Sequence, residues 1–143
     1  MIVKFCSREE AERTPPSPEV AVISITDADA DPVALGVSWM GVLRLDFDDV
    51  DPGHMINPFT KAAVLKRYSP MGSDQALRTV RYVEGMVKAG AKGFLVHCEH
   101  GQSRSAAVAK YIGERYGLPM DEGDLRFHNP HVYRMLKEAE QVP

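Results

Sequence analysis

The sequence lacks the features that mark secreted and membrane proteins. Only two cysteines, Cys6 and Cys98, occur in 143 residues, and nothing around them favours oxidation, so we expect two free thiols. The longest apolar-rich segment, 20–25, is far shorter than the about 20 residues that a membrane-spanning helix needs. No apolar stretch typical of a signal peptide precedes Lys4 and the charged residues 8–10. We therefore expect a cytoplasmic protein that does not act on membranes.

The sequence also lacks an excess of one charge. Seventeen lysine and arginine residues against 20 aspartate and glutamate residues give a formal net charge of −3. A general binder of nucleic acids or anionic surfaces carries a basic surplus instead, so we expect no nucleic acid as partner. Internal repeats and interdomain linkers are absent too, and the length is that of one domain, which predicts a single domain over residues 1–143.

What the sequence does contain is an alternation of strand and helix patterns. Runs rich in valine and isoleucine, or with alternating polarity, predict strands at 2–7, 20–26, 39–47 and 94–97. Apolar residues at three- and four-residue spacing predict helices at about 74–89, 104–116 and 129–140, with a short helix around 59–68 inside a long connection. This order predicts a three-layer α/β fold, with a mostly parallel central sheet of about four to five strands flanked by helices.

The segment "HCEHGQSRS", residues 97–105, joins the last predicted strand to a helix. Ligands bind at the carboxyl ends of such strands, and a turn that leads into a helix leaves backbone N–H groups free to hold an oxyanion. Gly101 supplies the backbone freedom that this turn needs, and the guanidinium of Arg104 fits two phosphate oxygens. These groups favour the thiolate form of Cys98. The segment thus combines a phosphate-binding loop with a nucleophile.

The same segment resembles the signature of the protein tyrosine phosphatase superfamily: His-Cys, five residues, Arg, then Ser or Thr, with glycine at position 101. A nearer resemblance is to small dual-specificity-like phosphatases of bacterial and phage type. They share an L-x-F-x-D segment, here 45–49, and a final helix similar to 129–140. The order of strand, loop and helix makes the signature specific.

This resemblance implies a role for each residue of the segment. Cys98 is the nucleophile that becomes phosphocysteine, Arg104 binds the phosphate, Ser105 hydrogen-bonds the sulfur, and His97 orients the loop from behind. Backbone amides bind the substrate phosphate; they belong to Glu99, His100, Gly101, Gln102, Ser103 and Arg104. The implied enzyme needs no cofactor and no metal, and its substrate is a phosphorylated protein or a small phosphomonoester.

The leaving group needs a proton, which this family takes from an aspartate on a separate loop. Four aspartates cluster ahead of the segment. We favour Asp49, two residues beyond Phe47, over Asp48 and then Asp51. Asp46 falls inside the predicted strand, which is typical of a surface or loop-anchoring residue.

Several alternatives remain open at this level. A phosphate-binding module without turnover would share the loop, and a rhodanese-like sulfurtransferase also places a cysteine in an anion-binding loop. A zinc site built on His97, Cys98 and His100 lacks the paired spacing of structural zinc sites. For Cys6 a buried structural role is favoured. The sequence does not choose among phosphoprotein, lipid, nucleotide and RNA phosphates, and it leaves the oligomeric state unknown.

Overall fold

Four parallel strands form one central sheet in the computed structural model, which describes residues 1–143. Their order is β1–β4–β2–β3, with bounds β1 (Ile2–Ser7), β2 (Val20–Thr26), β3 (Gly41–Asp46) and β4 (Gly93–Cys98). The two central strands are buried along almost their whole length, whereas burial alternates along the edge strands. This difference explains why β2 and β4 are continuous apolar runs and β3 alternates in sequence.

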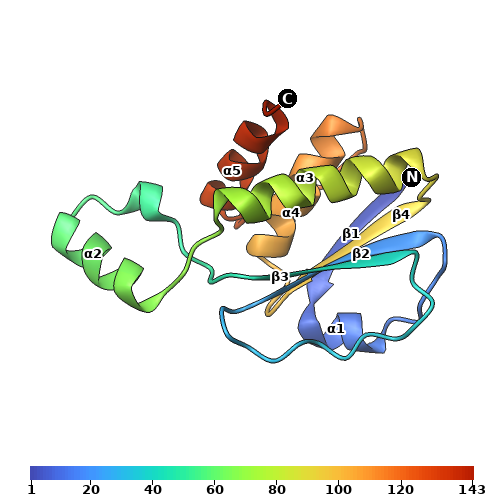
Figure 1. Cartoon of the computed structure of the whole chain (residues 1–143), viewed down its shortest axis with the longest axis horizontal. Coiled ribbons are helices and arrows are strands. Elements are labelled where there is room, and N and C mark those ends of the chain that lie inside the picture. Colours follow the sequence, from blue (N-terminus) through green and yellow to red (C-terminus); the bar gives the residue numbers. More distant parts are fainter.

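Helices cover both faces of the sheet and complete the predicted three layers (Figure 1). The helices α3 (Ser73–Lys88), α4 (Arg104–Arg115) and α5 (Pro130–Glu140) lie on one face. The opposite face carries only α1 (Arg8–Arg13), which the sequence patterns did not predict. Six residues are too few to show a helical period, and the only local signal is Ser7, whose side chain accepts a hydrogen bond from the Glu10 amide.

The hydrophobic core is correspondingly unequal on the two faces. A cluster of 20 buried residues fills the space between the sheet and α3, α4 and α5. On the α1 face the buried cluster has four members, among them Cys6, Ala11 and Leu95. Cys6 is a free, buried thiol, as predicted. No helix is both long and apolar enough to cross a membrane.

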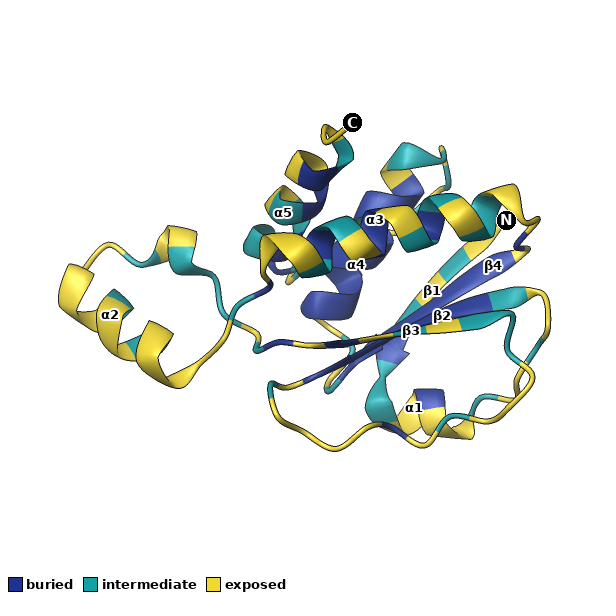
Figure 2. Ribbon diagram, viewed as in Figure 1, coloured by how far each residue is buried: buried dark blue, intermediate teal, exposed yellow.

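The long connection between β3 and α3 projects away from the body of the molecule (Figure 2). It contains a short 3₁₀ turn, η1 (Pro52–His54), and α2 (Pro58–Arg67), which buries none of its residues. Its two ends meet again where the amide of Asp48 donates to the carbonyl of Ser69 at 2.7 Å and the Ser69 amide donates to the Asp48 carboxylate at 2.8 Å. This closure holds the segment after β3 in place beside the sheet.

Candidate active site

The loop between β4 and α4 lies at the carboxyl end of the sheet, as the sequence predicts. Cys98 is the last residue of β4 and Arg104 is the first residue of α4. Between them, Gly101 adopts a φ of +71°, and a Cβ atom there would lie 2.4 Å from the Ser7 backbone nitrogen and 2.4 Å from the Cys6 carbonyl carbon. Only glycine satisfies both conditions, because other residues rarely adopt this φ and would clash with the end of β1.

This loop presents a row of hydrogen-bond donors without acceptors in the chain. The backbone N–H groups of residues 99–103 donate to no protein atom, whereas the carbonyls of Glu99 and Ser103 are both used. Donors left free at the start of a helix form a positive site for an anion, with the helix dipole adding to it. The loop therefore has the donor arrangement of an oxyanion-binding cup.

Cys98 lies at the base of this cup. The residue is 2% exposed, and its Sγ lies 3.2 Å from the Oγ of the buried Ser105 in the first turn of α4. A hydroxyl at this distance donates a hydrogen bond to a thiolate more strongly than to a thiol. The position of Ser105 therefore fits the predicted role of stabilising sulfur as an anion.

Arg104 is held with part of its guanidinium unused. Its Nη1 donates to the carbonyl of Phe47 at 2.8 Å and lies 2.8 Å from Oδ1 of Asp27, with which it forms a salt bridge. Its Nε is buried and has no partner, and its Nη2 makes no hydrogen bond within the chain. Nε and Nη2 form one edge of the guanidinium, and this edge remains free for bidentate contact with an oxyanion.

Asp27 is a site residue that the sequence analysis missed. It directly follows β2, the strand next to β4 in the sheet. The carboxyl ends of adjacent parallel strands share one edge of the sheet, so a carboxylate one residue beyond a buried strand was the available signal. The sequence alone did not show that β2, which ends just before Asp27, lies next to β4, which ends at Cys98.

The structure separates the aspartates that compete for the role of acid. Asp49 faces the cup: its Oδ1 accepts from the Ser103 hydroxyl at 2.8 Å and from the Asn129 side chain at 2.8 Å. Asp48 instead accepts backbone amides from Ala28 and Ser69, so it anchors loops. Asp51 contacts Arg134 and His54 farther out. The geometry thus favours Asp49 among these three.

Asn129 connects three parts of the site. The sequence analysis did not identify this connection. Its Oδ1 caps α5 by accepting the amides of His131 and Val132, which the Asn-Pro pair at a helix start does predict. Its Nδ2 donates to Asp49 and to the Val50 carbonyl. The backbone N–H of Asn129 donates to the Ser103 carbonyl at 3.1 Å. The aspartate loop, the cup and α5 therefore share one residue.

His97 supports the loop from inside the sheet. The residue is fully buried, its Nε2 lies 2.6 Å from Oγ of Ser24 on β2, and its Nδ1 lies 3.4 Å from the Cys98 carbonyl. Burial lowers the pKa of His97 below the ordinary value of 6.5, because the protonated ring would lose its hydration. The ring is therefore neutral near pH 7, and its two contacts fix the end of β4.

We expect this neutral histidine to make the fold sensitive to acid. The pKa of His97 is lower in the folded than in the unfolded chain. The folded state therefore keeps its full stability above about pH 6.5, the ordinary pKa of histidine, and loses stability as the pH falls below it, because the unfolded chain binds the proton more readily. The loss is at most about 1.4 kcal/mol per pH unit. Denaturant unfolding between about pH 7.5 and pH 5 should show a shallower decline for His97→Gln than for the wild type. His100→Gln, which changes an exposed histidine that forms no ion pair, should leave the slope unchanged; an unchanged slope in His97→Gln would contradict this assignment.

The two thiols should differ sharply in reactivity. Burial, followed by the charges of Glu10 and Cys98, raises the pKa of Cys6 to about 11, so Cys6 stays protonated near neutral pH. Iodoacetate is an anion that fits the cup, and at about pH 6 it should modify Cys98 at least about tenfold faster than Cys6. Peptide mass spectrometry measures both rates. Phosphate should slow the reaction of Cys98 only, and equal modification of both cysteines would count against an activated Cys98.

No group of three or more histidine, cysteine, aspartate or glutamate side chains lies close enough together to hold an ion. The two histidines near the start of α5 are engaged elsewhere: Nδ1 of His128 donates to the carbonyl of Leu125, and Nε2 of His131 donates to the carbonyl of Met71.

Comparison with known proteins places this fold. No protein-family model matches the chain, and no curated protein matches its sequence. Among solved structures, human DUSP28 is similar with a TM-score of 0.53 and 19% identity, over 97% of this chain and 91% of that one. Tk-PTP in the active form is similar with a TM-score of 0.51 and 18% identity, over 99% of this chain and 91% of that one. The chain therefore has the α/β fold of the tyrosine and dual-specificity phosphatases, as predicted.

Proposed function

We propose that this protein is a cysteine-dependent phosphatase that hydrolyses phosphomonoesters through a cysteinyl-phosphate intermediate. The observation that carries the proposal is the placement of Cys98 at the base of a loop whose five amides, 99–103, have no acceptor in the chain. The free edge of Arg104 adds two more donors. A site with this many donors around one sulfur binds a phosphoryl group and presents it to the nucleophile.

In the first step the Cys98 thiolate attacks phosphorus. An S–P bond forms as the P–O bond to the leaving group breaks, and the electron pair of that bond goes to the leaving oxygen. Asp49 donates its proton to this oxygen, so that a poor leaving group departs as a neutral alcohol rather than as an alkoxide. The loop amides and Arg104 take up the charge on the three remaining oxygens.

In the second step water displaces the sulfur. An O–P bond forms, the S–P bond breaks, and the Asp49 carboxylate now takes the proton of the attacking water. Cys98 leaves as a thiolate, which the hydroxyl of Ser105 stabilises from 3.2 Å. Inorganic phosphate then leaves the cup, and Cys98 and Asp49 are back in their starting protonation states. No cofactor takes part in either step.

Phosphorylated proteins are the substrates that this site favours, with phosphotyrosine and also phosphoserine and phosphothreonine as targets. Two carboxylates stand at the cup: Asp27, which is 54% exposed and pairs with Arg104, and Glu99, which is 41% exposed and lies 3.9 Å from Arg8. Negative charge here opposes a second phosphate close to the first, as in an inositol polyphosphate headgroup or a nucleoside polyphosphate. A single phosphomonoester on a protein side chain avoids that repulsion. We place this activity in a cytoplasmic protein whose 143 residues form one domain.

A binding module without turnover is the second candidate. It would keep the cup and Arg104, but it has no use for Ser105 beside the sulfur or for Asp49 held toward the cup by Ser103. A sulfurtransferase of the rhodanese type is less favoured still, because the arginine–serine pair after the cup matches phosphoryl transfer.

The activity itself is the first test. Purified protein should hydrolyse an aryl phosphate in the presence of a metal chelator, and vanadate, a phosphate analogue, should inhibit it. A panel of phosphopeptides then ranks the three side-chain targets. Strict dependence on a divalent ion would rule out the mechanism, and tight vanadate binding without hydrolysis would select the binding module.

A further inference from the structure

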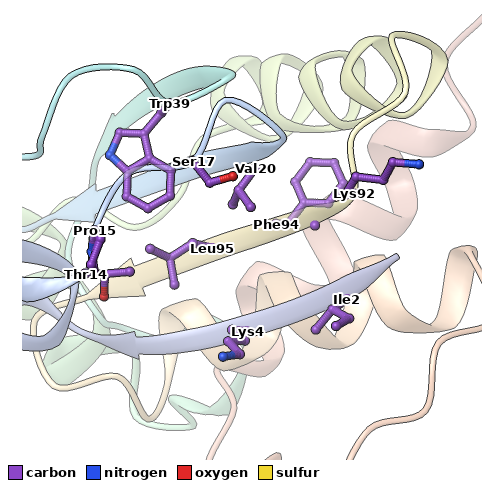
Figure 3. Close-up of a pocket in the computed structure, with 11 residues that line it drawn as sticks. Ile2, Lys4, Thr14, Pro15, Ser17, Val20, Trp39, Lys92, Phe94 and Leu95 are labelled. Atoms are coloured by element: carbon purple, nitrogen blue, oxygen red, sulfur yellow. The ribbon is translucent and has the colours of Figure 1, made fainter.

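A second cavity lies at the end of the sheet opposite the cup. It has a volume of about 270 Å³ and opens where β2 and β4 begin, on the face that carries α1. Figure 3 shows Val20, Leu95 and the indole of Trp39 around it, with Lys4 and Lys92 on other sides. None of these residues takes part in the proposed reaction.

The cavity exists because the α1 face is incompletely covered. The helix α1 has six residues and therefore spans only about 9 Å. Its one buried residue, Ala11, packs with Cys6, Val22 and Leu95. No helix covers this face near the amino-terminal ends of the strands, and Ile2, at the start of β1, remains 64% exposed. An apolar floor is thus left open to a ligand.

The polar side chains around this floor are positively charged or neutral, and none is negatively charged. Lys4 and Lys92 are exposed lysines, Thr14 and Ser17 contribute hydroxyls, and no aspartate or glutamate lines the cavity. In a chain with a net charge of −3, a cavity with two cations and no anion is selective for negative ligands. Its apolar floor selects for a hydrocarbon portion.

We propose that this cavity binds an anionic amphiphile, a hydrocarbon chain of medium length that ends in one carboxylate or one phosphate. The chain lies on Val20, Leu95 and the Trp39 ring, and the head group stays at the rim, where the lysines reach it while their stems cover part of the chain. The volume of 270 Å³ is near the lower end for ligand cavities, which suits a short chain and excludes a two-chain lipid.

The cavity is separate from the proposed phosphatase site. Gly93, which lines the cavity, and Cys98 are the two ends of β4, so about 16 Å of strand lies between them. Binding of the amphiphile therefore neither requires nor tests the phosphatase activity, and the two proposals fail or succeed independently.

Trp39 is the only tryptophan in the sequence, so its fluorescence reports on this cavity alone. Its indole N–H is buried and has no hydrogen-bond partner, so packing alone holds the ring, and a ligand beside it should shift its emission. We expect saturable binding of butanoate, hexanoate and octanoate, with affinity rising about fourfold per methylene group until the cavity is full. Alkyl phosphates of equal length distinguish a phosphate head from a carboxylate head. Calorimetry on the same samples measures binding if the emission does not move.

Charge reversal provides the matched variants. Lys92→Glu and Lys4→Glu should each weaken octanoate binding by up to about fivefold, and more at low salt. Lys88→Glu, on the exposed side of α3, should have no effect, although it changes the net charge equally. Octanol should bind more weakly than octanoate, but by a smaller factor than the two lysine variants remove together, because each Lys→Glu change adds a repulsion as well as removing an attraction. The proposal is overturned if neither method detects saturable binding below the micellar concentration, or if octanol and octanoate bind equally well.

Discussion

Cys98→Ser should lower the rate of phosphomonoester hydrolysis by more than about 10⁴-fold, because loss of a nucleophile removes the covalent step altogether. A serine hydroxyl in the same cup is far less ionised than a thiol, so the favourable charge of the loop does not generate a competent nucleophile. The donors are untouched, since the amides of 99–103 and the free edge of Arg104 do not depend on the sulfur. Vanadate or a phosphopeptide should therefore still bind. Steady-state kinetics and calorimetry measure the two quantities separately.

Cys6→Ser is the matched control. Cys6 is buried against α1 on the opposite face of the sheet, and its substitution should leave the catalytic rate near that of the wild type at a modest cost in stability. Turnover by Cys98→Ser at the wild-type rate would exclude a cysteinyl-phosphate intermediate. Loss of phosphate binding in the same variant, with the fold intact, would mean that the cup depends on the sulfur itself.

Asp49→Asn should slow hydrolysis by about 10²–10⁴-fold when the leaving group is the alkoxide of a serine, because that oxygen needs a proton as it departs. Aryl phosphates with acidic leaving groups should lose much less. Asparagine keeps the acceptor that Ser103 and the Asn129 amide group use, so the loop should stay in place. Rates over a series of leaving groups measure the effect, and their dependence on leaving-group acidity should become steeper in the variant.

Two further variants separate this effect from its alternatives. Asp48→Asn should weaken the closure with Ala28 and Ser69 and therefore lower stability without changing the dependence on the leaving group. Arg104→Lys should slow all substrates alike, because a point charge does not replace two parallel hydrogen bonds. Equal slowing of every substrate by Asp49→Asn would mean that another residue is the general acid. If Asp48→Asn instead slows substrates with poor leaving groups most, that acid is Asp48.

The cup was predictable from the sequence because it is local. Residues 97–105 contain the nucleophile, the glycine, the arginine and the serine in one contiguous stretch, and a strand followed by a helix fixes how they meet. The four strands were equally accessible, since the apolar runs of β2 and β4 and the alternation of β3 have a direct physical cause in burial.

The rest of the site depends on contacts between distant segments. Asp27 reaches Arg104 only because β2 lies next to β4 in the sheet, and a single sequence does not give the strand order. The side chain of Asn129 lies 80 positions from Asp49 in sequence, so its capping role was visible and its contact with the aspartate loop was not. The helix α1 was missed for a different reason, because charged residues dominate its six positions and leave no apolar period.

The most direct test of the central claim is to trap the intermediate. The protein should be mixed with an aryl phosphate, quenched in acid within the first turnovers, and digested for peptide mass spectrometry. We predict one phosphoryl group on the peptide that contains Cys98, its amount reaching a steady level during turnover and its absence in Cys98→Ser. Continued turnover with no phosphoryl group on Cys98, or with the group on another residue, would contradict the mechanism.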